Sequence, residues 1–247
     1  MHLFYKLDYQ KFIDYNIKDV ELVDKLEDKL KLMELLITIA YQSKINYEDV
    51  FSPIRTWDAI IFEELKRNNI VIPNVMDNKK STAFAGAYVK EPDVGIHDWV
   101  VSFDLNSLYP HLIMQYNISP ETLIEGHNIK TDVNSLLSDN TDTSDALQMN
   151  ATLCPSGVMF NKDNKGFLPK LMQNMYDDRT KFKKQMLKIK QEKENGEGDP
   201  VLQTKQISAL NNKQMAAKIL LNSCYGALGN QYFRYFEKNQ AEAITVG

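Results

Sequence analysis

Asp104 is the residue of this chain whose surroundings first suggest chemistry. The alternation along residues 99–105 predicts a strand, and one face of it carries Trp99, Val101, Phe103 and Leu105. After Leu105 the pattern becomes helical, with Pro110 in the first turn, where proline is best tolerated. A carboxylate at the end of a strand, beside the free N–H groups of a helix start, suits a hard divalent cation such as Mg²⁺ and a polyphosphate. The alternative is that Asp104 only caps the helix, and the local pattern does not choose between the two.

A second group of candidate residues lies on a predicted antiparallel helical hairpin. Its helices extend from Pro169 to about Lys193 and from about Val201 to Leu228, joined by the turn-prone stretch 195–200. On the first helix, Arg179 and Lys183 face the same way. One stripe of the second helix carries Lys218, Asn222, Tyr225, Gly226 and Gly229. The opposite face is predicted to be core and carries Ala217, Leu220, Leu221, Cys224 and Leu228, so Cys224 is interpreted as packing.

Charge and composition narrow the class of protein. The 247 residues carry a net charge of −4, yet residues 162–190 hold nine Lys or Arg against three Asp, a local excess that suits phosphates. A lysine-rich helix is more often a solvated charged face, and Tyr225 could equally be core. The order of strand-end carboxylate, helix start and cationic hairpin favours nucleotidyl transfer. The sequence predicts no membrane span or secretory leader and a cytoplasmic location, and its two cysteines form no ligand spacing or disulfide framework.

The remaining elements are predicted from periodicity and turn residues. The predicted helices are residues 9–40, with an apolar stripe of Val20, Val23, Leu26, Leu30, Met33 and Ile37, and residues 56–68. Then follow a connector at 71–80, a short strand at 84–90, a polar surface loop at 128–150, and a hairpin from Thr152 to Phe167 whose turn is residues 161–165. Tyr15 and Asp19 share one side of the first helix, where a solvated helix start is the plainer interpretation.

These motifs resemble those of family B DNA polymerases, in particular the branch of the T-even-type bacteriophages. FDLNSLYP, residues 103–110, resembles motif A of that family, and KILLNSCYGALGN, residues 218–230, resembles its motif B. Arg179 and Lys183 resemble the conserved fingers pair, and Tyr15 with Asp19 resembles the third motif of the 3′–5′ exonuclease domain. The resemblance covers nearly the whole chain and is weakest over residues 127–150.

The resemblance implies an α+β fold in which a partial polymerase palm, an antiparallel sheet with helices, joins a long helical-hairpin fingers subdomain. The implied regions are the end of an exonuclease domain with linker helices (1–75), the first part of the palm with an insertion near 127–150 (76–168), the fingers (169–230) and a return to the palm (231–247).

The resemblance also implies residue roles in template-directed DNA synthesis. The catalytic residues would be Asp104, which would bind two Mg²⁺ ions with help from the Leu105 carbonyl, and Lys218. Backbone N–H groups of Ser107, Leu108 and Tyr109 would hold the triphosphate of a dNTP, and the Tyr109 ring would exclude a 2′-OH. The side chains implied to bind the outer phosphates are Arg179, Lys183 and Lys218, supported by Asn222. Tyr225 and Gly226 would lie near the nascent base pair of the primer–template DNA, and Asp19, oriented with Tyr15, would bind an exonuclease metal.

Some features depart from the family. The family's second palm aspartate, in a Y-G-D-T-D-S type motif, has no match here, nor do the first two exonuclease motifs. We therefore expect a fragment or one half of a split polymerase, inactive without a second polymerase chain, and in the complete enzyme a sliding clamp is a further candidate partner. The alternative is a non-catalytic nucleic-acid-binding remnant of the fold; the bulky Tyr109 disfavours an RNA polymerase or primase. His111 replaces a residue that is usually small, with a packing or groove role expected.

Overall fold

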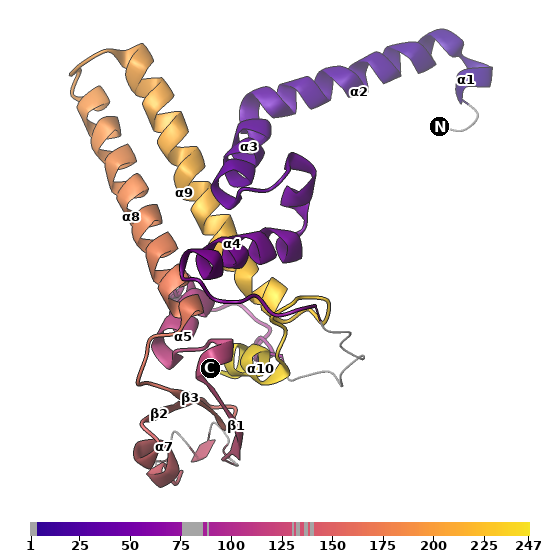
Figure 1. The fold of residues 1–247 in the computed structure, drawn as a ribbon. Coiled ribbons are helices and arrows are strands. Elements are labelled where there is room, and N and C mark those ends of the chain that lie inside the picture. Colours follow the sequence, from indigo (N-terminus) through magenta and orange to yellow (C-terminus); the bar gives the residue numbers. More distant parts are fainter. Residues whose placement is uncertain are drawn as a thin grey trace.

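The computed structural model describes residues 4–75, 86–87, 89–129, 131, 134–135, 138 and 141–247. Its longest feature is the antiparallel pair of α8 (Phe167–Glu194) and α9 (Pro200–Leu228), which lie side by side (Figure 1). The Asp199 carboxylate caps α9 by accepting from the N–H groups of Val201 and Leu202. The predicted helical hairpin is confirmed, with α8 starting two residues earlier than expected. All five predicted core residues of α9 are buried.

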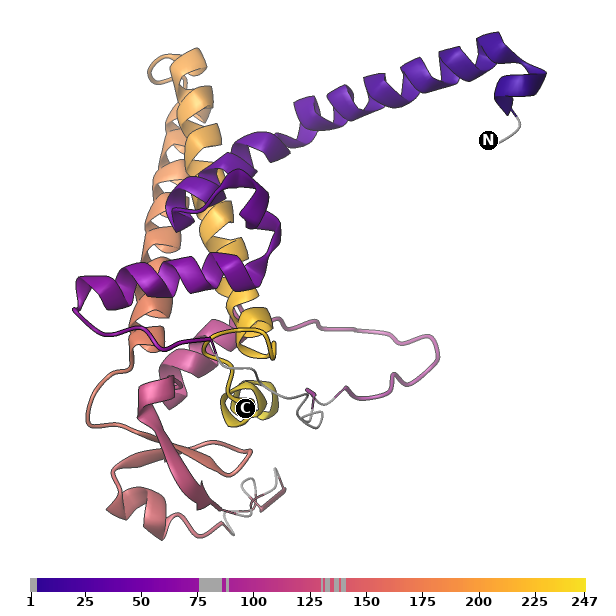
Figure 2. The ribbon, with the colours of Figure 1, turned by 45° about the vertical axis from the view of Figure 1, so that its right-hand side comes forward.

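The first part of the chain is helical, as predicted, but it is interrupted. After α1 (Phe4–Leu7), α2 (Tyr9–Leu30) and α3 (Leu32–Ser43) meet at Lys31, which adopts a left-handed backbone (φ 53°, ψ 41°). The single predicted helix over 9–40 is wrong at this point, because lysine carries no sequence signal for such a break. In both ribbon views α2 projects away from the rest of the molecule (Figure 2). No residue of α2 is buried.

The helices α3 and α4 (Pro53–Arg67) pack against α9. The short helix η1 (Tyr47–Phe51) precedes α4, whose first turn is capped by the Ser52 hydroxyl and holds Pro53 at its start. This helix was predicted to begin at Thr56. The connector is irregular over 71–75, and residues 76–80, on the far side of the predicted boundary at 75–76, lie outside the described residues. Of the predicted strand 84–90, residues 84, 85 and 88 also lie outside them, and the described residues 86–87 and 89–90 have no regular structure.

A small antiparallel sheet has the order β1-β3-β2, from β1 (Leu123–Asn128), β2 (Ala151–Leu153) and β3 (Val158–Asn161). Phe160 pairs with Leu123 on one side and with Thr152 on the other. The predicted hairpin exists, but its turn is Cys154–Gly157, not 161–165, because Gly157 supplies the positive φ (85°) that the tight turn needs. The predicted surface loop 128–150 is also corrected, since it contains α7 (Ser144–Gln148) with Ala146 buried.

The predicted strand at 99–105 is wrong. These residues have no regular structure, and the side chains of Trp99 and Phe103 are 99% and 92% exposed. A strand requires a neighbour for its backbone hydrogen bonds. Within the described part of the chain, no strand pairs with this segment. The apolar face that the alternation predicts therefore remains exposed, because no strand among the described residues pairs with this segment.

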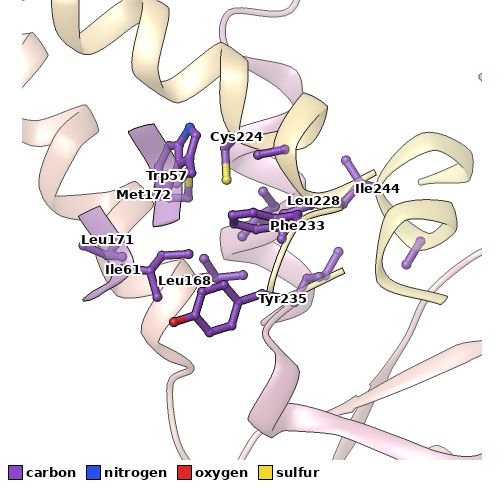
Figure 3. Packing of buried hydrophobic residues seen from close by; sticks show 14 of the residues in the cluster. Trp57, Ile61, Leu168, Leu171, Met172, Cys224, Leu228, Phe233, Tyr235 and Ile244 are labelled. Carbon is purple, nitrogen blue, oxygen red and sulfur yellow. The ribbon is translucent and has the colours of Figure 1, made fainter. Parts of the chain in front are cut away.

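The main hydrophobic core joins α4, α5 (Leu108–Tyr116), the start of α8, the end of α9 and α10 (Lys238–Val246). Figure 3 shows Trp57, Met172, Cys224 and Phe233 meeting in it. At the end of α5, Asn117 donates from its amide to the carbonyls of Asn161 and Asn164 at 2.7 and 2.9 Å. Its side-chain oxygen also accepts from the Gly166 N–H, and the 3-10 turn η2 (Pro120–Thr122) follows. These bonds fix α5 against the start of α8.

The fold is α+β, as predicted, mostly helical with one small antiparallel sheet. Among the residues that the structure describes, no helix has both the length and the apolar character needed to cross a bilayer.

Candidate functional site

A cavity of about 440 Å³ opens between the start of α5 and the facing sides of α8 and α9. Most of the residues singled out from the sequence line it. The lining consists of residues 104–110, Arg179, Lys218 and Asn222. Three segments that are far apart in the sequence thus converge on one space, as the motifs predicted.

The start of α5 supplies free backbone donors. Ser107 is the N-cap residue and has a left-handed backbone (φ 55°, ψ 46°), and its side chain forms no capping bond. The first intrahelical bond comes from the His111 N–H to the Ser107 carbonyl at 3.1 Å. Pro110 has no N–H, so the free donors of the first turn are the amides of Leu108 and Tyr109. Two amides and a helix N-terminus at a cavity wall can bind an anion.

Arg179 provides the cation nearest to this turn. Its Nη1 donates to the Ser107 hydroxyl at 3.0 Å. Its Nε is buried and has no hydrogen-bond partner in the described part of the chain. Lys183, one turn further along α8, is exposed and is not part of the cavity lining. Of the predicted fingers pair, the structure therefore brings only Arg179 to the cavity.

The predicted polar stripe of α9 is confirmed. Lys218 and Asn222, one turn apart, are both exposed and both line the cavity. Tyr225 and Tyr109 face each other, with ring centroids 4.7 Å apart and planes tilted by 41°. Burial, and secondly the proximity of the Tyr109 oxygen, raises the pKa of the Tyr225 phenol. Gly226 has open space on its side-chain side, where a flat group can approach the helix backbone.

Asp104 lies in the cavity lining and is exposed. No group of three or more His, Cys, Asp or Glu gathers anywhere among the described residues. One carboxylate and the neighbouring Leu105 carbonyl are nevertheless the kind of oxygen donors that Mg²⁺ accepts, because this ion is commonly held by one or two carboxylates together with substrate phosphates. The donor set fits such an ion only in part without a further carboxylate.

Tyr15 and Asp19 are not brought to this cavity. They lie on α2, the helix that projects away from the hairpin (Figure 1), and the Tyr15 side chain is 43% exposed. The predicted exonuclease residues and the predicted polymerase residues thus belong to separate parts of the molecule.

The contacts of His111 and Trp57 are among those at the site that were not predicted from the sequence. His111 Nδ1 lies 2.9 Å from the Ser107 carbonyl, and its ring meets the Tyr176 ring of α8 edge-on. Trp57 Nε1 donates to the Ser223 hydroxyl at 3.1 Å, fixing α9 next to Asn222. The four-residue spacing from Ser107 to His111 was a usable signal for the first contact. The second joins residues 166 positions apart, and no local pattern announces it.

Both Cys154 and Cys224 are buried, free thiols, and burial raises the pKa of each. The interpretation of Cys224 as packing is confirmed, because a buried neutral thiol is inert.

Comparison with known proteins identifies the family. The sequence model of DNA polymerase family B matches residues 55–247, and the chain belongs to this family. It is 32% identical to the DNA-directed DNA polymerase of Enterobacteria phage T4 over 278 residues and 33% identical to that of Escherichia phage RB69 over 282 residues. Each match covers 97% of this chain and 30% of the relative, so the chain spans under a third of the length of these proteins.

The fold agrees with this assignment. The structure of the family B DNA polymerase from the archaeon Pyrobaculum calidifontis superposes with a TM-score of 0.69 at 24% identity, over 96% of this chain and 28% of that one. The resemblance of the motifs to family B polymerases, and to the T-even-type phage branch, is confirmed.

Proposed function

We propose that this chain carries the motif A and fingers portion of a DNA-directed DNA polymerase. The reaction is the attack of a primer 3′-OH on the α-phosphate of a dNTP, with pyrophosphate as the leaving group. The observation that supports it is the single cavity that gathers Asp104, the free amides of α5, Arg179, Lys218 and Asn222. A carboxylate, two amides and two cations around one space form a set of groups suited to a metal-bound triphosphate.

Each wall of the cavity has its own task in this proposal. The free amides of Leu108 and Tyr109, with the Ser107 amide beside them, bind the β- and γ-phosphates. The side chains of Arg179 and Lys218 bind the same phosphates and neutralise their charge. Lys183 joins them from the next turn of α8, and Asn222 orients the Lys218 contact. Two Mg²⁺ ions, held in part by Asp104 and the Leu105 carbonyl, would activate the 3′-OH and stabilise the phosphoryl group in transfer.

In this proposal, Tyr109 and Tyr225 position the sugar and the base of the nucleotide. In this proposal the Tyr109 ring lies under the deoxyribose, where it leaves no room for a 2′-OH, and Tyr225 supports that ring, with the two centroids 4.7 Å apart. The open surface over Gly226 accepts the nascent base pair of the primer–template DNA. A dNTP is thereby preferred over a ribonucleotide.

The active site is proposed to be completed by polymerase segments outside these 247 residues, either in the rest of a longer chain or in a second polymerase chain. Those segments supply the second palm carboxylate and strands that pair with residues 99–105, whose alternating side chains are exposed. Tyr15 and Asp19 belong in the same way to an exonuclease site that other segments complete. We propose the same division of the chain as above: the end of an exonuclease domain with linker helices (1–75), the first part of the palm (76–168), the fingers (169–230) and a return to the palm (231–247). A sliding clamp is proposed as a partner of the complete enzyme, and the host cytoplasm as its location.

Nucleotide binding tests the proposal directly. Titration calorimetry of the purified chain with Mg·dATP is expected to give saturable binding, weakened about tenfold or more by Asp104→Ala and by Lys218→Ala, since each removes a charge-assisted contact. Lys184→Ala is the matched control, because Lys184 is an exposed lysine of α8 outside the cavity. If the chain binds DNA with an affinity that changes neither on adding nucleotide nor in these variants, it is instead a non-catalytic nucleic-acid-binding protein.

Primer extension tests the completion of the site. The chain alone is expected to extend no primer, and extension is expected when a second chain with a paired-aspartate motif is added. Extension by the purified chain alone would contradict the incomplete site.

A further inference from the structure

His111 makes two bonds to one backbone oxygen. The Ser107 carbonyl accepts from the His111 N–H at 3.1 Å and from the imidazole Nδ1 at 2.9 Å. A carbonyl oxygen can only accept, so Nδ1 carries a proton in this arrangement. The imidazole thus adds a second hydrogen bond to the Ser107 carbonyl, which already accepts the first backbone hydrogen bond of α5, and Ser107 lines the cavity.

The same imidazole also contacts α8. Its ring lies edge-on to Tyr176, with centroids 4.8 Å apart and planes at 82°. Tyr176 precedes Arg179 by three residues, so both side chains leave the same side of α8. Because Arg179 donates to the Ser107 hydroxyl at 3.0 Å, Ser107 is held through its carbonyl by His111 and through its side chain by Arg179.

Ser107 needs this support because its backbone is left-handed (φ 55°). That conformation is unfavourable for a residue with a Cβ, and it persists only where neighbouring contacts enforce it. If Ser107 relaxed to a right-handed or extended backbone, the N–H groups of Leu108 and Tyr109 would point away from their present direction. With Pro110 lacking an N–H, the turn has no spare donor to replace them.

We propose that His111 is a positioning residue for the bound triphosphate. By holding Ser107 left-handed, it aims the two free amides of α5 and the Arg179 guanidinium at the same phosphate oxygens before the nucleotide arrives. His111 itself is not among the residues that line the cavity. The inference rests on the proposed function of the cavity, and it adds a residue outside the cavity lining to the determinants of nucleotide affinity.

Two amide substitutions separate the hydrogen bond from the rest of the side chain. His111→Asn places its amide nitrogen near the position of Nδ1, whereas His111→Gln places it near that of Nε2, away from the Ser107 carbonyl. We expect His111→Gln to bind Mg·dATP and inorganic pyrophosphate about three- to tenfold more weakly than the unsubstituted chain, the ratio that one neutral hydrogen bond supports. His111→Asn is expected to stay within about twofold.

Calorimetric affinities are compared with melting temperatures of the same samples. A loss of affinity in His111→Gln that His111→Asn restores, at matched melting temperatures, supports the positioning role. Equal affinities for His111→Gln and the unsubstituted chain overturn it, as do parallel losses of affinity and melting temperature in both variants, which would indicate packing alone. If the unsubstituted chain binds neither probe, the proposed function fails and this inference fails with it.

Discussion

The two long helices α9 and α2 differ in what covers them. Of the 29 residues of α9, nine are buried, whereas none of the 22 residues of α2 is buried. Both have an apolar face, yet Val20, Val23 and Leu26 of α2 are 61%, 64% and 55% exposed. An amphipathic pattern thus shows which face of a helix is suited to burial, but the neighbours decide whether burial occurs. The candidate nucleotide-binding residues lie on or next to α5, α8 and α9, and none of them lies on α2.

The largest expected effect is the loss of the α4–α9 contact in Trp57→Ala. Trp57 is fully buried, and its Nε1 donates to Ser223, which in turn donates to the Leu220 carbonyl. Truncation leaves a cavity and an unmet hydrogen bond, so the free energy of unfolding is expected to fall by about 3–5 kcal/mol. Urea unfolding followed by circular dichroism measures it.

Leu26→Ala is the matched truncation on α2. It is expected to change the free energy of unfolding by no more than about 0.5 kcal/mol, because Leu26 is already exposed. A loss as large as that of Trp57→Ala would mean that α2 is packed in solution and that the contrast between the helices is wrong.

The β2–β3 turn and the helix α9 differ in the space around their glycines. Gly157 closes the β2–β3 turn with φ +85°, and a Cβ there would lie 2.1 Å from the carbonyl oxygen of Ile129. Because that neighbour is backbone, Gly157→Ala is expected to destabilise the hairpin by about 2–4 kcal/mol through strain and overpacking. The Cys154 N–H donates to the Val158 carbonyl and the Ile129 N–H donates to the Gly157 carbonyl, so hydrogen exchange of these two amides reports the loss locally.

Gly226→Ala is the control for that substitution. Gly226 is helical, with open space where the Cβ would be, so the same change is expected to stabilise α9 by up to about 1 kcal/mol. Destabilisation at both glycines would show that the Gly157 effect does not come from its turn.

The helices could be predicted from the sequence because their signals are local. Repeats of apolar residues and the Asn195–Pro200 turn placed α8 and α9 within a few residues. The prediction of a strand at 99–105 failed, because strand pairing depends on a neighbouring strand that a local pattern does not contain. The cavity was predicted as a set of side chains, but the Arg179–Ser107 bond and the left-handed Ser107 arise only when α5 and α8 are brought together.

The ion pair between Arg234 and Asp58 is partly buried, and breaking it is expected to have an intermediate effect on the free energy of unfolding. Arg234 forms a two-bond pair with Asp58 of α4, at 2.8 and 3.2 Å, and donates to the Pro73 carbonyl. The hydrogen bond to Asp58 raises the pKa of Arg234 above its ordinary value. Arg234→Lys cannot keep this fork, so we expect a loss of about 1–2 kcal/mol in the free energy of unfolding, measured by urea denaturation.

Arg55→Lys supplies the exposed counterpart. Arg55 pairs with Asp49, but its side chain is 72% exposed, so the substitution is expected to change stability by less than about 0.5 kcal/mol. Equal losses in the two variants would show that burial does not distinguish the pairs.

Among the covered residues Trp57, Gly157, Arg234 and Tyr235, the smallest effect is expected at Tyr235. Its hydroxyl is buried without a hydrogen-bond partner among the described residues, and burial, then the Asp58 carboxylate, raises the pKa of Tyr235 to about 12. A raised pKa in the folded state means that the stability from the neutral phenol is complete below the ordinary value near 10 and is lost as the pH rises toward 12.

At pH 7, Tyr235→Phe is therefore expected to be neutral or stabilising by up to about 1 kcal/mol, since no bond is broken. Urea midpoints at pH 7 and pH 10.5 should show a larger alkaline loss in the unsubstituted chain than in Tyr235→Phe. Equal alkaline losses would mean that water reaches this hydroxyl, and that cover at this end of the core is looser than at Trp57.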